Sequence, residues 1–211
     1  MNLNVTDVVR NLILINVIVY VFGAFILPEE ITDHWLAVYY PASEKFQPVQ
    51  LITYMFMHDT RGITHILFNM FGLYMFGPPI EYNWGPKRFL FYYLTAGFGA
   101  LVLHFGVQYY QINFLGYPSE IGDVPMVGAS GAIFRLLAAY GMMFPNNVVQ
   151  MLFPPIPMKA KYFVLLYAGL ELYLGISGSQ SGVAHFAHLG GALFGFLLIM
   201  YWRNGGTVGR N

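Results

Sequence analysis

Charged residues are sparse along the chain and separate long apolar stretches from one another. Six stretches rich in Leu, Ile, Val and Phe lie between the charged positions. Each is close to the roughly 20 residues that cross a bilayer as a helix. Their approximate limits are residues 11–27, 62–80, 89–107, 127–144, 162–176 and 181–202. The pattern predicts an all-α, polytopic membrane protein in which six transmembrane helices form one domain over residues 1–211.

The segments around these stretches predict how the helices are joined. The first stretch lacks a small-residue cleavage site at the expected place, so we expect a retained helix rather than a signal peptide. The connection 28–61 mixes aromatic and acidic residues, which suits a segment lying in the membrane interface. The connection 145–161 contains Pro154, Pro155 and Pro157, which exclude a helix there.

Composition supports the same class of protein. Hydrophobic residues make up 57% of the chain and charged residues 9%, whereas a soluble domain carries about 25% charged residues. The lipid bilayer is therefore the expected environment. The formal net charge is zero, so no basic field attracts nucleic acid. The chain has no Cys, which excludes disulfides and thiolate chemistry.

The distribution of Lys and Arg predicts the orientation in the membrane. If the N-terminus is cytoplasmic, the segments on the cytoplasmic side of the membrane carry seven Lys and Arg residues. The segments on the outer side carry only two. This bias follows the positive-inside rule. We therefore expect both termini in the cytoplasm, with the second, fourth and sixth helices all entering from the outer surface. The absence of a transit peptide and of Cys favours a bacterial plasma membrane.

Four polar residues fall at one shallow depth in these three helices. His65 and Asn69 lie in the second stretch, Ser130 in the fourth and His188 in the sixth. Each is within about two turns of the outer end, at a rise of about 1.5 Å per residue. Topology alone thus brings a hydroxyl, two imidazoles and an amide into one layer.

This set of groups is what acyl transfer requires. A serine hydroxyl becomes a good nucleophile when a base takes its proton, and a neutral His can do so near pH 7. His65, Asn69 and the backbone N–H of Ser130 could donate hydrogen bonds to the oxyanion. No Asp or Glu is expected at this depth, which favours a Ser–His dyad over a triad.

Each residue also has a structural interpretation. A Ser flanked by glycines in a membrane helix is often a close-packing site, and an Asn can join two helices. His185 and His188 could bind a metal together with His65, but no carboxylate or thiolate is expected to complete such a site. We therefore expect neither a metal nor another cofactor. His185, nearer the outer surface than His188, is expected to orient or gate.

Three motifs give the chain a resemblance to the rhomboid intramembrane serine proteases over nearly its whole length. The motifs are His65-Ile66-Leu67-Phe68-Asn69, Gly128-Ala129-Ser130-Gly131, and Ala187-His188-Leu189-Gly190-Gly191 followed by Gly195. The resemblance implies a six-helix rhomboid-like bundle with Ser130 as nucleophile and His188 as its base. It implies that His65, Asn69 and the Ser130 N–H form the oxyanion site. It also implies that Phe134 packs beside the catalytic histidine and that Glu81 is a structural acid.

The resulting expectation is a serine endopeptidase that cleaves other membrane proteins near the outer ends of their transmembrane helices. Two alternatives stay open at this point. One is a rhomboid-like pseudoenzyme that binds membrane proteins without cutting them. This alternative is favoured by Arg135, which stands where the family usually has a small residue. The other is a small transporter or proton path that uses His65, His185, His188 and Glu171. A serine-reactive probe that labels Ser130 would favour the enzyme.

Arg135 is the main departure from the family pattern, which usually has a small residue there. A long cation at this position is expected to hinder the approach of the Gly131 ridge to Gly191 and Gly195. Arg135 and Glu171 are both expected near the bilayer midplane. We therefore hypothesise that Arg135 turns toward Glu171 or toward buried carbonyl groups.

Overall fold

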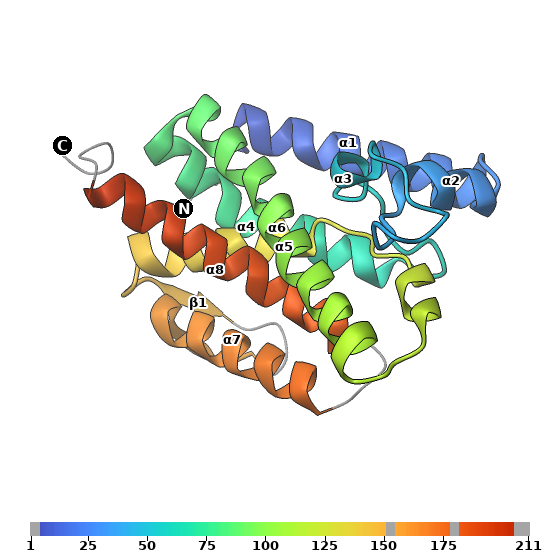
Figure 1. The fold of residues 1–211 in the computed structure, drawn as a ribbon. Coiled ribbons are helices and arrows are strands. Elements are labelled where there is room, and N and C mark those ends of the chain that lie inside the picture. Colours follow the sequence, from blue (N-terminus) through green and yellow to red (C-terminus); the bar gives the residue numbers. More distant parts are fainter. Residues whose placement is uncertain (1–4, 151–154, 178–181, 205–211) are drawn as a thin grey trace.

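The computed structural model describes residues 5–150, 155–177 and 182–204, and its main elements are six long helices (Figure 1). These are α1 (Asp7–Phe25), α4 (Thr64–Trp84), α5 (Pro86–Phe114), α6 (Ser130–Met143), α7 (Ala160–Ile176) and α8 (Gly182–Asn204). The shorter elements are α2 (Glu29–Leu36), α3 (Gln50–Thr53), the 3-10 helix η1 (Ser119–Asp123), and the strands β1 (Val148–Gln150) and β2 (Pro157–Lys159). Each predicted apolar stretch coincides with one long helix, so the predicted all-α polytopic fold is confirmed.

The helices differ in whether their length and hydropathy are those of a membrane span. Among the described residues, α1, α5 and the part of α8 from His185 to Asn204 are long and apolar enough to cross a bilayer. Helices α6 and α7 have only 14 and 17 residues. Helix α4 carries His65, Asn69 and Glu81 within its length. Helices α4, α6 and α7 also contribute most of the polar groups described below.

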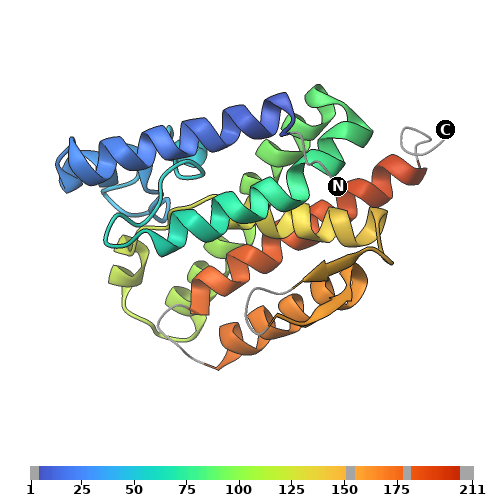
Figure 2. The same cartoon turned by 180° about the vertical axis from the view of Figure 1, so that it is seen from behind.

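Helix α8 lies in the middle of the bundle, with α5, α6 and α7 around it (Figures 1 and 2). Glycines permit this close packing. A Cβ atom at Gly191 would overlap the Gly131 carbonyl group of α6. A Cβ atom at Gly190 would lie 2.8 Å from the Gly99 carbonyl oxygen of α5. The backbones of α5, α6 and α8 therefore touch directly, which fixes their side chains relative to one another.

A carboxylate from α4 anchors the start of α1. Glu81 accepts hydrogen bonds from the backbone N–H groups of Val8 and Val9 at 3.1 and 2.9 Å, and from the Thr6 hydroxyl. Free N–H groups at a helix N-terminus favour an anionic partner. The structure confirms the predicted structural role of Glu81.

The connection between α1 and α4 is folded over the end of the bundle. The buried side chain of Gln50 accepts hydrogen bonds from the backbone of Tyr39 and Gln47 and donates to the carbonyls of His34 and Lys45. A β-bridge between Val38 and Met126 joins this connection to the segment that precedes α6. The connection therefore holds the entry to α6 in place.

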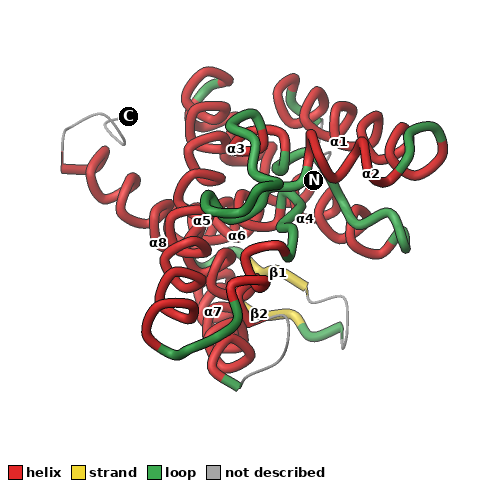
Figure 3. Tube along the Cα trace, turned by 45° about the vertical axis from the view of Figure 1, so that its right-hand side comes forward, coloured by secondary structure: helices red, strands yellow, loops and turns green. Residues whose placement is uncertain are grey.

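Two strands that the sequence did not predict lie between α6 and α7 and run beside α7 (Figure 3). They pair antiparallel, with Val149 opposite Met158. Pro157 opens β2, a strand position that needs no donated ladder hydrogen bond. Pro154 lies outside the described residues, and Pro155 and Pro157 lie in non-helical chain, as predicted.

Candidate active site

Ser130 is the first residue of α6, and a turn with a positive φ at Gly128 brings the chain to it. Gly128 has φ +111°, a conformation that residues with a side chain rarely adopt. A Cβ atom there would lie 2.9 Å from both Cε1 and Nε2 of His65. The Gly128 N–H donates to the Tyr54 carbonyl at 2.9 Å. A glycine is thus required both for the turn and for contact with His65.

The structure brings Ser130 and His188 together across the α6–α8 interface. Ser130 Oγ and His188 Nε2 are 2.8 Å apart, which is hydrogen-bonding distance. The imidazole ring of His188 stacks on Phe134, with 4.5 Å between ring centroids and 5° between planes. This stacking confirms the predicted contact of Phe134 and fixes the ring so that Nε2 faces the hydroxyl.

A carboxylate lies on the other side of the same imidazole. Glu171 Oε2 is 2.9 Å from His188 Nδ1 and 2.6 Å from His185 Nδ1. The expectation that no Asp or Glu reaches this depth is wrong. Helix α7 ends at Ile176, five residues after Glu171. At about 1.5 Å per residue, Glu171 is only about 7.5 Å from the outer end of the helix and not near the midplane.

The same contacts correct the expectation about metal ligands. Glu171, His185 and His188 each offer one ligand atom, and these atoms lie within 4.8 Å of one another. Glu171 is the carboxylate that was expected to be missing, and it joins His185 and His188 in place of His65. Among the described residues, these three form the group that could hold a metal ion.

Beside the Ser130 hydroxyl, a cavity of about 170 Å³ opens between the helices. Its walls come from Tyr54, His65, Ala100, Met126, Val127, Gly128, Ser130, Gly131, Ala187 and His188. His65 Nδ1 accepts a hydrogen bond from the Asp59 backbone N–H at 3.3 Å. A neutral imidazole whose Nδ1 accepts carries its proton on Nε2. The Nε2–H of His65 and the backbone N–H of Ser130, in the first turn of α6, are therefore donors beside this space.

Asn69 is not among the residues that line this cavity. Its Nδ2 donates to the His65 carbonyl of the preceding turn at 2.8 Å, and its side chain is buried. His65 and Asn69 are four residues apart and lie on one face of α4, but only His65 reaches the space next to Ser130.

His58 is a site residue that the sequence reading missed. It is fully buried, and its ring meets the His65 ring edge-on with centroids 5.2 Å apart. Burial, assisted by the neighbouring His65, lowers the pKa of His58 to about 4. The ring is therefore neutral at pH 7 and supports His65 by packing. The loop position of His58, outside every apolar stretch, gave no indication of this contact.

Arg135 does not pair with Glu171. Its guanidinium lies 4.0 Å from the centroid of the Tyr92 ring of α5, and its methylene stem crosses the bare backbone of Gly195. The Tyr92 hydroxyl donates to the Arg135 carbonyl at 3.1 Å. Both the pairing hypothesis and the expected obstruction are wrong, because Gly195 leaves room for the stem and Tyr92 offers a cation–π partner.

Comparisons with known proteins relate this chain to one family. A family model described as the Rhomboid domain matches residues 45–204. Rhomboid protease AarA of Providencia stuartii is 34% identical over 182 residues, covering 84% of this chain and 59% of that protein. RHOMBOID-like protein 12, mitochondrial, of Arabidopsis thaliana is 33% identical over 150 residues, covering 67% of this chain and 43% of that protein.

For a third relative, the matched region covers a larger share of that protein's length. Putative rhomboid protease YdcA of Bacillus subtilis (strain 168) is 33% identical over 153 residues, covering 71% of this chain and 67% of that protein. The chain thus spans roughly half to two thirds of the length of these relatives. The family match extends over most of the chain and contains every residue of the site described above. The chain therefore belongs to the rhomboid family of polytopic helical membrane proteins.

Proposed function

We propose that this protein is an intramembrane serine endopeptidase that cleaves transmembrane proteins near the outer surface of the membrane. The observation that carries the proposal is the 2.8 Å contact between Ser130 Oγ and His188 Nε2, at the edge of a cavity that could admit a peptide carbonyl. Relatives named rhomboid protease support it.

His188 acts as the general base and then as the general acid. As Ser130 Oγ attacks the scissile carbonyl carbon, its proton passes to His188 Nε2 and a tetrahedral oxyanion forms. The protonated Nε2 then gives this proton to the leaving amine, the C–N bond breaks, and an acyl ester remains on Ser130. Water, deprotonated by the same nitrogen, hydrolyses the ester and restores the free serine.

Glu171 positions His188 for both steps. An ionised carboxylate only accepts hydrogen bonds, so its 2.9 Å contact requires a proton on His188 Nδ1. Nε2 is then bare and faces Ser130, which is the tautomer that a base needs. The negative charge also stabilises the imidazolium that forms during attack. The geometry thus supports a Ser–His–Glu arrangement in place of the dyad.

The oxyanion is stabilised by His65 and by the N-terminus of α6. Nε2–H of His65 and the backbone N–H of Ser130 both lie beside the cavity. Preorganised donors in a site shielded from bulk water stabilise developing charge strongly. Asn69 contributes indirectly, since its amide holds the carbonyl of His65.

Substrates enter sideways from the lipid, next to α7. The outer half of this helix exposes Leu170, Leu172, Tyr173 and Ile176, with 47–71% of each residue accessible. Glu171 is the buried residue among them. Substrate helices with Gly, Pro or polar residues near the outer surface are favoured, because their peptide bonds are less protected. We also propose that both termini are cytoplasmic and that the membrane is a bacterial plasma membrane.

Cleavage of a transmembrane substrate by the purified chain in proteoliposomes tests the function. We expect Ser130→Ala and His188→Ala to abolish cleavage while thermal unfolding stays close to that of the wild type. Ser119→Ala, which changes an exposed serine, is the matched control and should cleave normally. Normal cleavage by Ser130→Ala would exclude the proposed nucleophile.

A further inference from the structure

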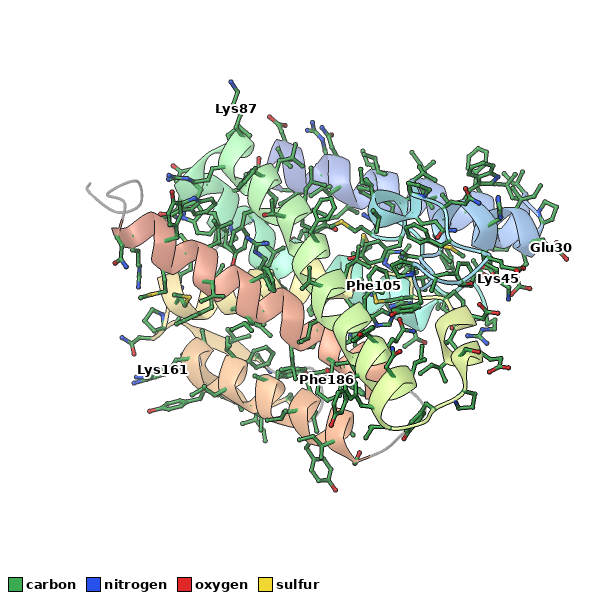
Figure 4. The ribbon with its side chains drawn as sticks, viewed as in Figure 1. Glu30, Lys45, Lys87, Phe105, Lys161 and Phe186 are labelled. Carbon is green, nitrogen blue, oxygen red and sulfur yellow. The ribbon has the colours of Figure 1, made fainter. Side chains whose placement is uncertain are left out.

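Glu171, His185 and His188 converge behind the proposed base, on the side away from Ser130. One carboxylate oxygen faces the Nδ1 atoms of both histidines, at 2.6 and 2.9 Å. The three side chains are only 10%, 16% and 19% exposed. Phe186 fills the space between α7 and α8 beside them (Figure 4), where a Cβ atom at Gly175 would lie 3.2 Å from its ring. The cluster is therefore held by packed helices.

We propose that these three side chains form an inhibitory site for Zn²⁺. Two imidazole nitrogens, one carboxylate oxygen and a water molecule are a common ligand set for four-coordinate zinc. Ligand atoms about 2.0–2.1 Å from a tetrahedral ion are about 3.3 Å from one another. The separations here, 2.6 and 2.9 Å for two pairs and no more than 4.8 Å for any pair, bracket that value. Small rotations of the side chains are enough to admit the ion.

Zinc binding changes the tautomer of His188. Without metal, both Nδ1 atoms carry protons that they donate to Glu171. A coordinating nitrogen must be bare, so each ring moves its proton from Nδ1 to Nε2, and the number of bound protons stays the same. His188 Nε2 then donates to Ser130 Oγ and has no lone pair to accept the serine proton. The inhibition follows from this exchange, with no contact between the ion and the substrate.

The types of ligand atom also predict which metal ions bind this site and inhibit. Imidazole nitrogen suits zinc and neighbouring transition metals, whereas Mg²⁺ and Ca²⁺ prefer oxygen ligands. Mg²⁺ and Ca²⁺ are therefore expected to leave the site empty at concentrations where Zn²⁺ fills it.

Binding is measured first, on the full chain in detergent, by calorimetry with Zn²⁺ and by the visible absorption of Co²⁺. Ser130→Ala keeps all three ligands and should bind one zinc ion per chain, as the wild type does. Glu171→Gln and His185→Gln should each bind at least about tenfold more weakly. His34→Gln, a matched change at an exposed histidine, should bind as the wild type. Unchanged binding in both ligand variants, or no binding by wild type, would overturn the site.

Inhibition is measured second, and this arm rests on the proposed protease function. Zinc should stop cleavage by the wild type, a chelator should restore it, and Mg²⁺ should have no effect. His185→Gln should need at least about tenfold more zinc for half-inhibition, relative to its own metal-free rate. Zinc that binds at these ligands and leaves the rate unchanged would overturn the inhibitory role. A chain that binds zinc but never cleaves would contradict the proposed function and leave the site standing.

Discussion

Replacing Glu171 by Gln tests the contact that the sequence did not predict. The amide oxygen can still accept from both histidines, so the change chiefly removes the negative charge. The 2.9 Å contact to Nδ1 puts that charge about 4 Å from the centre of the imidazolium. At an effective dielectric constant of 20, such a pair contributes about 4 kcal/mol. Partial exposure of the site reduces this, so we expect kcat to fall by about 10²–10³-fold.

Steady-state cleavage of a transmembrane substrate in proteoliposomes, with a chelator present, measures the effect. The loss should appear in kcat with little change in KM, because the charge acts when His188 becomes protonated. Glu171→Asp should restore part of the rate, since it keeps the charge at a greater distance. Glu120→Gln, at an exposed acid, is the matched control. A Glu171→Gln enzyme within about threefold of wild type, or one changed only in KM, would refute the positioning role.

Five further substitutions probe the surrounding structure. His65→Ala should lower kcat by about 10²–10³-fold through loss of an oxyanion donor, and Asn69→Ala should lower it less, both measured in the same cleavage assay. Gly128→Ala should cost about 1–3 kcal/mol from its positive φ and displace the His65 ring, seen as a lower melting temperature and slower cleavage. Arg135→Gly should lower the melting temperature in detergent by leaving a cavity. Adding Glu171→Gln to Arg135→Gly should not restore the melting temperature. Glu81→Gln should destabilise the fold by about 1 kcal/mol, measured by thermal unfolding, with cleavage retained at low temperature.

The helices could be predicted from sequence because membrane insertion depends on hydropathy over about 20 residues. The stretches around His65, Ser130 and His188 were located within a few residues of the observed helix ends. Their common depth followed from topology, and it brought Ser130 and His188 to hydrogen-bonding distance. These inferences needed only the rise of a helix and the side of the membrane from which it enters.

Azimuth and side-chain reach could not be predicted in the same way. Glu171 was expected near the midplane although the predicted stretch 162–176 already ends only five residues after it, where α7 also ends. The carboxylate therefore lies level with His188. Arg135 was expected to face Glu171 because depth does not fix direction around a helix. It faces Tyr92, and Gly195 gives it room. His58 and the two strands depend on tertiary packing that no local pattern encodes.

The most direct test of the account is mass spectrometry of the purified chain after reaction with a serine-reactive phosphonate. We predict one adduct per chain, located on the peptide that contains Ser130, with labelling lost in Ser130→Ala and strongly slowed in His188→Ala. Labelling of Ser119 as readily as Ser130, or a Ser130 that stays unmodified while the chain cleaves its substrate, would contradict the claim that His188 activates Ser130.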